Sequence, residues 1–197
     1  MLVKMIQEKI GHDVIVLIGA PCSGKSTQSK ILGKALHLPY LSPGDLFRAE
    51  VANGTALGQQ LAAYMDSGET IPNELTTTFL TAKFNEPLYR NGMIIDGFPR
   101  NFSHLAVLDK ILTNTARRIF AAIYLDVSKS QLDERRAHRC RYDDNTGTAE
   151  RRYTIFIQDT VPLINQLDQE KKLIKVRCCS ESPEEVTERL LTELSKL

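Results

Sequence analysis

The sequence lacks the features of a membrane or secreted protein. No apolar run among its 197 residues is long enough to cross a bilayer, and residues 1–12 lack the long apolar region of a signal peptide. Hydrophobic residues make up 42% of the chain, which is enough for one sizeable core. We therefore expect a single domain that resides in the cytoplasm without membrane contact.

The chain also lacks a charge excess, a cysteine framework and several diagnostic motifs. Its net charge is +1, so the overall charge gives no reason to expect a nucleic-acid partner. No N-K-x-D motif occurs, which disfavours a GTPase switch. The cysteines form no paired C-x-x-C motif, so we expect reduced thiols and no structural zinc. They are Cys22, Cys140, Cys178 and Cys179.

What the chain does contain is an alternation of short β-rich runs with helical patterns, which predicts an α/β fold with a parallel sheet. Ligands of such sheets bind beyond the carboxyl ends of the strands. The expected strands are 14–18, 40–41, 93–96, 119–125 and 173–176. The expected helices are 25–37, 44–52, 57–67, 73–89, 102–114, 128–138, 149–170 and 184–196.

The first motif follows the first expected strand. Residues 19–26, Gly-Ala-Pro-Cys-Ser-Gly-Lys-Ser, match the phosphate-loop pattern G-x-x-x-x-G-K-[ST]. Glycines in such a loop let main-chain N–H groups turn toward a phosphate, and Lys25 can reach the outer phosphates of a nucleotide. The alternative is a Gly/Ser turn between a strand and a helix.

The second motif, Asp96-Gly97-Phe98-Pro99-Arg100, closes the third expected strand. A carboxylate there is suited to orient the water shell of Mg²⁺ near a phosphate loop, and an arginine can bind a phosphate with two nitrogens. We therefore predict a magnesium site that involves Ser26 and Asp96 through water. The alternative is a Gly-Phe-Pro turn with two solvated charges.

A third segment, Ser42-Pro43-Gly44-Asp45, has the pattern of a helix start. Ser42 fits the N-cap and Pro43 the first helical position, and Asp45 can close a capping box. This pattern does not explain Arg48, which is either solvated or directed toward a second anionic ligand.

Arginines are concentrated in residues 135–152. Like charges this close repel, so the cluster indicates a polyphosphate ligand. Acidic neighbours could instead neutralise it as a solvated face. A nucleic-acid patch is disfavoured because few aromatic residues alternate with the arginines. The members are Arg135, Arg136, Arg139, Arg141, Arg151 and Arg152.

These four elements, in this order, resemble the adenylate kinase family of nucleoside monophosphate kinases in its short-lid form. The resemblance implies a P-loop NTPase three-layer fold, with a five-stranded parallel sheet flanked by helices. It implies a single kinase domain at 13–197, preceded by an N-terminal extension at 1–12. A helical insertion at 43–72 would bind the nucleoside monophosphate, and 135–148 would form a very short lid. We expect a monomer.

The resemblance implies transfer of the terminal phosphoryl group from MgATP to a nucleoside monophosphate, and we favour AMP. The residues that it assigns to ATP are Gly19, Cys22, Ser23, Gly24, Lys25, Ser26, Thr27, Arg135 and Arg139. Those that it assigns to the acceptor are Ser42, Pro43, Arg48, Glu69, Thr70, Ile71, Gly97, Phe98, Arg100, His104, Arg141 and Arg152. The residues expected to act in catalysis are Lys25, Arg100, Arg139, Arg141 and Arg152.

Three residues depart from the family pattern. Pro43 stands where adenylate kinases usually carry threonine, and His104 where they usually carry a base-reading glutamine. Asn101, directly after Arg100, matches UMP/CMP kinases, so a pyrimidine acceptor is the alternative. Cys22 replaces a usual glycine, and is either a nucleophilic thiol that controls ATP access or a tolerated small residue. A non-catalytic nucleotide-binding regulatory module is the remaining alternative class.

Overall fold

A five-stranded parallel sheet organises the molecule. The computed structural model describes residues 1–138, 146–178 and 181–197. The strand order is β2-β3-β1-β4-β5, and every neighbouring pair is parallel. The predicted α/β class with a parallel sheet is therefore confirmed. The strands are β1 (Val14–Ile18), β2 (Tyr40–Leu41), β3 (Met93–Asp96), β4 (Ile119–Asp126) and β5 (Leu173–Arg177).

Alternating side chains of β1 supply two separate hydrophobic cores. All five residues of β1 are buried, which fits its central place in the sheet. Val14, Val16 and Ile18 belong to one core, whereas Ile15 and Leu17 belong to the other. Since successive side chains of a strand point to opposite faces, the two cores lie on opposite sides of the sheet.

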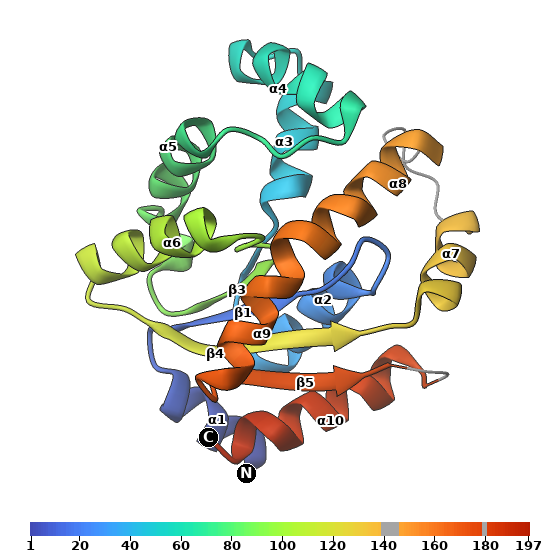
Figure 1. Cartoon of the computed structure of the whole chain (residues 1–197). Helices are drawn as coiled ribbons and strands as arrows, with labels where there is room; N and C mark the ends of the chain where they lie inside the picture. The colour runs from blue at the N-terminus through green and yellow to red at the C-terminus, as the bar shows by residue number, and fades with distance from the viewer. Residues whose placement is uncertain (139–145, 179–180) are drawn as a thin grey trace.

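Helices cover both faces, giving three layers (Figure 1). One face packs against α1 (Leu2–Ile10), α2 (Lys25–Leu36) and α10 (Pro183–Ser195). The other packs against α5 (Asn73–Phe84), α6 (Phe102–Asn114) and α9 (Val161–Gln169). This is the three-layer arrangement expected of a P-loop NTPase. No helix within the described ranges is long and apolar enough to span a membrane.

Helix α1 lies within residues 1–12, the predicted N-terminal extension. Ile6 and Ile10 are spaced by one helical turn and are almost fully buried. They pack in the core that α1 shares with α2 and α10. The spacing of these two isoleucines is a weak local signal, because the apolar partners come from elements far along the chain.

Two predicted helices are interrupted, and a proline lies at each interruption. The helix expected at 73–89 ends at Phe84, and Pro87 begins a separate 3₁₀ turn, η1 (Pro87–Tyr89). The helix expected at 149–170 consists of α8 (Thr146–Ile155), a π-helical turn η2 (Phe156–Thr160) and α9. Pro162 is the second residue of α9, and its missing N–H and bulky ring favour a wider turn before it.

A helical hairpin stands away from the sheet in Figure 1. It consists of α3 (Pro43–Ala52) and α4 (Ala56–Ser67), with a small core of its own around Phe47 and Leu61. Gly58 allows the close contact, since a Cβ there would lie 2.1 Å from the Glu50 carbonyl oxygen. The last helix, α7 (Lys129–Ala137), precedes the undescribed segment 139–145. Apart from the two interrupted helices and α1, the elements agree with the predicted bounds to within about a residue at each end.

Candidate active site

The loop between β1 and α2 has the backbone conformation that its glycines allow. Gly24 is the residue before α2 and has φ 97°, in the region that favours glycine. At Gly19, a Cβ would lie 2.8 Å from Ser23 Oγ and 3.1 Å from the Leu125 carbonyl oxygen. The two glycines of the pattern are thus required for different reasons, Gly24 for its dihedral angle and Gly19 for space.

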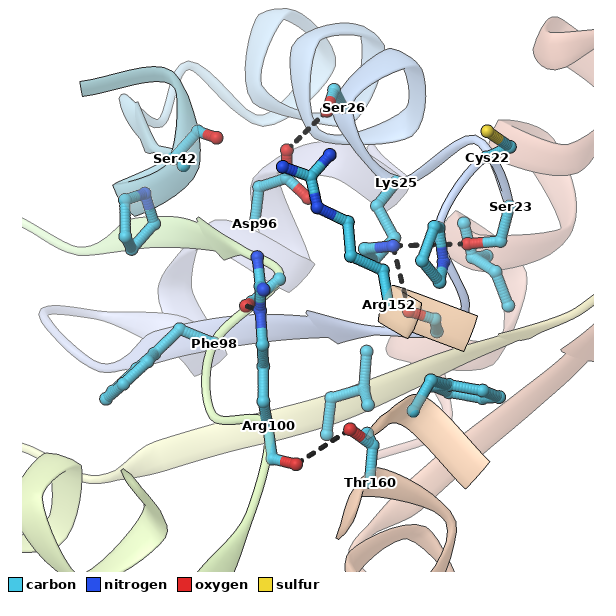
Figure 2. Close-up of a pocket in the computed structure, with 18 of the residues that line it drawn as sticks. Cys22, Ser23, Lys25, Ser26, Ser42, Asp96, Phe98, Arg100, Arg152 and Thr160 are labelled. Atoms are coloured by element: carbon cyan, nitrogen blue, oxygen red, sulfur yellow. Dashed lines mark hydrogen bonds between the residues drawn. The ribbon is translucent and has the colours of Figure 1, made fainter. Parts of the chain in front are cut away.

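Lys25 folds back against this loop (Figure 2). Its Nζ donates to the carbonyl oxygens of Gly19, at 2.9 Å, and Ala20, at 2.7 Å. A third, longer hydrogen bond of 3.4 Å reaches Ser23 Oγ. The ammonium group is therefore held beside the loop, where it can pair with an anion that the loop binds.

Cys22 adopts an uncommon backbone conformation. Its φ is 66°, a left-handed value that residues with a Cβ seldom adopt. The side chain is partly buried and lines the cavity described below. The turn therefore suits glycine at this position, and the thiol occurs where the loop faces the cavity.

Asp96 and Ser26 form a pair suited to a hard cation. Asp96 ends β3 and is 5% exposed, and its Oδ2 accepts a hydrogen bond of 2.6 Å from Ser26 Oγ. Carboxylate and hydroxyl oxygens are ligands that Mg²⁺ prefers, and Mg²⁺ commonly keeps waters and substrate phosphates as its other ligands. The donor set of this pair therefore fits the magnesium prediction. Among the described residues, no group of three or more His, Cys, Asp or Glu side chains could hold a metal ion.

Arginines from three separate segments approach the other end of the cavity. Arg48 pairs with Asp45 one turn earlier on α3, and Arg152 donates to the Met65 carbonyl oxygen at 3.1 Å. Arg100 donates from Nε to the Gly97 carbonyl oxygen at 2.9 Å. A Cβ on Gly44 would lie within 4 Å of both the Arg48 and Arg100 guanidinium groups, so these two cations lie close together.

The electrostatic environment of Arg100 is unusual. Water reaches its side chain through the cavity, yet the surrounding protein atoms lower the pKa of its guanidinium, and the charges of Arg152 and Arg48 lower it further. The negative charge of Asp96 raises the pKa of Arg100 and so partly offsets this lowering. Clustered cations of this kind are stabilised by an anion with several negative charges.

His104 lies in the first turn of α6, behind the loop that carries Arg100. Asn101 caps this helix, accepting from the His104 main-chain N–H at 2.8 Å. The imidazole is 4% exposed and packs on Phe98 with ring centroids 4.8 Å apart. Burial, together with the nearby charge of Arg100, lowers the pKa of His104 to about 4. The ring is therefore neutral at physiological pH.

A single cavity of about 700 Å³ brings these parts together. Figure 2 shows Lys25, Asp96, Arg100 and Arg152 directed toward a common space. Arg135 joins it from α7, donating to the Ser23 carbonyl oxygen at 3.1 Å. Arg139 and Arg141 lie outside the described residues. The predicted site residues that line this cavity are Gly19, Cys22, Ser23, Gly24, Lys25, Ser26, Thr27, Ser42, Pro43, Arg48, Glu69, Thr70, Ile71, Asp96, Gly97, Phe98, Arg100, His104, Arg135 and Arg152.

Sequence reasoning missed several residues that line the same cavity. Thr160, in the π-helical turn, donates from Oγ1 to the Arg100 carbonyl oxygen at 2.7 Å. Phe47 and Met65 add apolar surface from the helical hairpin. The sequence around Phe47 and Met65 shows no pattern that distinguishes these two residues from ordinary core residues. Pro162, inside an expected helix, was the available signal for an irregular turn near Thr160.

Comparisons with known proteins agree with this arrangement. The family model described as adenylate kinase matches residues 17–173. The chain is 36% identical to the adenylate kinase of Thermobifida fusca (strain YX), covering 91% of this chain and 97% of that protein. It is 39% identical to the adenylate kinase of Corynebacterium urealyticum, covering 77% and 83%, and 34% identical to adenylate kinase 1 of Synechocystis sp. (strain PCC 6803), covering 93% and 95%. The chain belongs to the adenylate kinase family.

Proposed function

We propose that this protein reversibly transfers the terminal phosphoryl group of MgATP to AMP, giving two molecules of ADP. The observation that carries the proposal is the single cavity that holds a phosphate loop at one end and clustered arginines at the other. A site of this form suits two phosphorylated ligands that meet end to end. Family membership favours AMP over the UMP/CMP alternative, since the three relatives compared above are adenylate kinases.

The donor end is proposed to bind ATP through the loop from Gly19 to Thr27. Residues of this loop and of the start of α2 line the cavity, as expected of an anion site at a helix N-terminus. Lys25 supplies a positive charge to the outer phosphates. Arg135 contacts the loop at Ser23, which supports a role beside the ATP base or phosphates.

The acceptor end is proposed to hold the monophosphate through Arg48, Arg100 and Arg152. Their guanidinium groups come from the helical hairpin, the loop after β3 and α8. Around them lie Ser42, Pro43, Glu69, Thr70, Ile71, Gly97, Phe98 and His104. A cationic end with an apolar wall suits a nucleotide that presents its phosphate to the arginines and its base to the wall.

The chemistry requires placement and charge neutralisation more than proton transfer. Phosphoryl transfer through a loose transition state spreads charge over the transferred group, and fixed cations stabilise that charge. Lys25, Arg100 and Arg152 are directed into the space between the two ends. Magnesium, held by Ser26 and Asp96 through water, would neutralise phosphate charge when bound. Arg139 and Arg141, in the proposed lid at 135–148, would add two further cations on closure and exclude water.

Family membership also supports assignments of the domain bounds, the oligomeric state and the cellular location. We propose a kinase domain at 13–197, an acceptor-binding insertion at 43–72 and an extension at 1–12. A monomer in the cytoplasm, without nucleic-acid or membrane partners, is the state we propose. Size-exclusion chromatography with light scattering tests the oligomeric state directly.

The decisive experiment measures nucleotide products with ATP and a panel of acceptors, namely AMP, CMP, UMP and GMP, with and without Mg²⁺. We expect ADP formation from ATP and AMP that depends on Mg²⁺. A strong preference for CMP or UMP would replace AMP as the acceptor. Nucleotide binding without turnover of any acceptor would support the regulatory-module alternative.

A further inference from the structure

Gln28 is a buried polar side chain that joins two helices beside the cavity. It lies one turn after Gly24 on α2, lines the cavity and is 4% exposed. Its Nε2 donates to the carbonyl oxygen of Pro183, the first residue of α10, at 2.8 Å. The hydroxyl of Thr187, one turn further along α10, donates to Gln28 Oε1 at 2.7 Å. Both polar atoms of the carboxamide therefore bind the start of α10.

The two partners determine how the carboxamide is oriented. A carbonyl oxygen can only accept, so the NH₂ group of Gln28 must face Pro183 and its oxygen must face Thr187. The Thr187 hydroxyl also lies 2.9 Å from the Pro183 carbonyl oxygen, which gives it a second acceptor within reach. Since hydrogen bonds are directional, this arrangement fixes the first turn of α10 against the start of α2.

The sheet places the start of α10 on the donor side of the cavity. The strand order is β2-β3-β1-β4-β5, and the carboxyl ends of parallel strands lie at one edge. The helical hairpin follows β2, the loop of Arg100 follows β3 and the phosphate loop follows β1. Residues that follow β5 therefore lie on the opposite side of the phosphate loop from the acceptor end.

This side of the cavity has an apolar wall. Leu125 of β4 and Val186 of α10 are 1% and 4% exposed, and both line the cavity together with Pro183. Arg135 borders the same side from α7, which follows β4. A nucleotide with its phosphates on the loop can direct its base toward this wall, away from the acceptor arginines. Gln28 thus connects the helix that begins at the phosphate loop to the wall that faces the donor base.

We propose that Gln28 is a positioning residue, which holds this wall at the distance from the phosphate loop that a nucleoside triphosphate spans. The inference rests on the proposed function and concerns the nucleoside part of the donor. A correctly placed wall lets the base and the phosphates bind at the same time, whereas a displaced wall leaves the phosphates alone to bind. Gln28 therefore contributes to the affinity for ATP and not to the affinity for its triphosphate group.

The variant Gln28→Met separates these two affinities. Methionine has a similar length and no group that donates to Pro183, and Thr187 still reaches the Pro183 carbonyl oxygen. By calorimetry, we expect the Kd of MgATP to rise about tenfold and that of magnesium tripolyphosphate to change less than about twofold. The KM for ATP should rise similarly, while kcat and the KM for AMP stay within about twofold.

Two results would overturn the assignment of Gln28: an equal change in both Kd values, or no change in either. Failure of the unaltered protein to phosphorylate AMP would instead reject the proposed function. The comparison of MgATP with magnesium tripolyphosphate measures binding alone, so the two failures are distinguishable.

Gln7→Met is the matched control. Gln7 donates from Nε2 to the carbonyl oxygen of Leu36 at 2.9 Å, so it makes the same kind of hydrogen bond at the far end of α2. The ratio of the two Kd values should stay within about twofold of the original in this variant. A shift as large as that in Gln28→Met would mean that any loosening of α2 weakens ATP binding, and would overturn the specific role of Gln28.

A measurement on the unaltered protein covers the case in which Gln28→Met fails to fold. Because coupling between two contacts is reciprocal, a base bound at the wall should stabilise the hydrogen bond from Gln28 to Pro183. We therefore expect saturating MgATP to slow solvent exchange of the Gln28 side-chain amide protons more than saturating magnesium tripolyphosphate does. Equal exchange rates with the two ligands, measured by NMR, would contradict the positioning role.

Discussion

The hydroxyl group of Thr160 donates to the main-chain carbonyl oxygen of Arg100 across 2.7 Å, although the two residues are 60 positions apart in the chain. Thr160 is 4% exposed and ends the π-helical turn η2, while Arg100 lies in the loop that follows β3. The hydrogen bond thus connects the backbone of a proposed catalytic residue to the π-helical turn before α9. Figure 2 shows this contact below the cavity.

Thr160 is therefore expected to position Arg100. Thr160→Val retains the shape but removes the donor, so we expect kcat to fall about tenfold through misplacement of Arg100. The free energy of unfolding should fall by about 1 kcal/mol, because the Arg100 carbonyl loses its partner in this partly buried hydrogen bond. Steady-state kinetics and urea unfolding measure the two effects. Thr160→Ser keeps the hydroxyl and should remain close to the original; equal losses in both variants would argue against the hydrogen bond.

Arg100 itself is expected to act on the transferred phosphoryl group. Its guanidinium lies in the cavity rather than in the core, so Arg100→Ala should lower kcat by about a hundredfold or more with little change in thermal midpoint. Arg100→Lys keeps the charge but not the planar pair of donors, and should give an intermediate rate. Circular dichroism confirms folding. Near-normal turnover in Arg100→Ala would remove this residue from the catalytic group.

Chemical modification of the Cys22 thiol is expected to prevent ATP binding at the phosphate loop. Its side chain lines the cavity, so alkylation should block ATP binding, and bound MgATP should slow the labelling. Cys22→Gly removes the thiol and should keep its activity after treatment with the same reagent. Labelling rates that are equal with and without MgATP would contradict the expectation.

The same substitution tests the left-handed backbone at Cys22. A residue with a Cβ pays a cost at φ 66° that glycine does not, of about 1 kcal/mol. Glycine in turn loses about 0.5–1 kcal/mol more conformational entropy on folding. The two effects oppose each other, so the free energy of unfolding of Cys22→Gly should differ from the original by less than about 1 kcal/mol. Denaturant unfolding at pH 7.5 measures the difference.

Patterns within short segments predicted the sheet and most of the cavity. The apolar run 14–18 followed by the glycine and lysine pattern predicted both β1 and the loop after it. Parallel strands bring their carboxyl ends to one edge, so the sequence alone predicts that Asp96 and Ser26 lie close together. Contacts set by long-range packing could not be predicted in this way. No sequence pattern near Thr160 identifies Arg100 as its partner. Helix α1 is short, and packing against α2 and α10 stabilises it.

The depressed pKa of His104 predicts how stability depends on pH. Burial and the charge of Arg100 lower this pKa from 6.5 to about 4 in the folded protein, whereas the unfolded chain keeps the ordinary value. Between these two values the unfolded state binds a proton that the folded state does not, so folding is progressively disfavoured as pH falls from about 6.5 to about 4. The full effect is roughly 3 kcal/mol.

Comparison with His104→Gln isolates this contribution from that of other titrating groups. Glutamine does not titrate, so the variant should lose less stability than the original chain when urea unfolding is measured at pH 7.5 and again at pH 4.5. The difference in free energy of unfolding between the two proteins should therefore shift in favour of the variant by about 2–3 kcal/mol. Below about pH 4 the folded state also binds the proton, and the shift should level off. Parallel pH profiles for the two proteins would mean that His104 is as easily protonated in the folded chain as in the unfolded one.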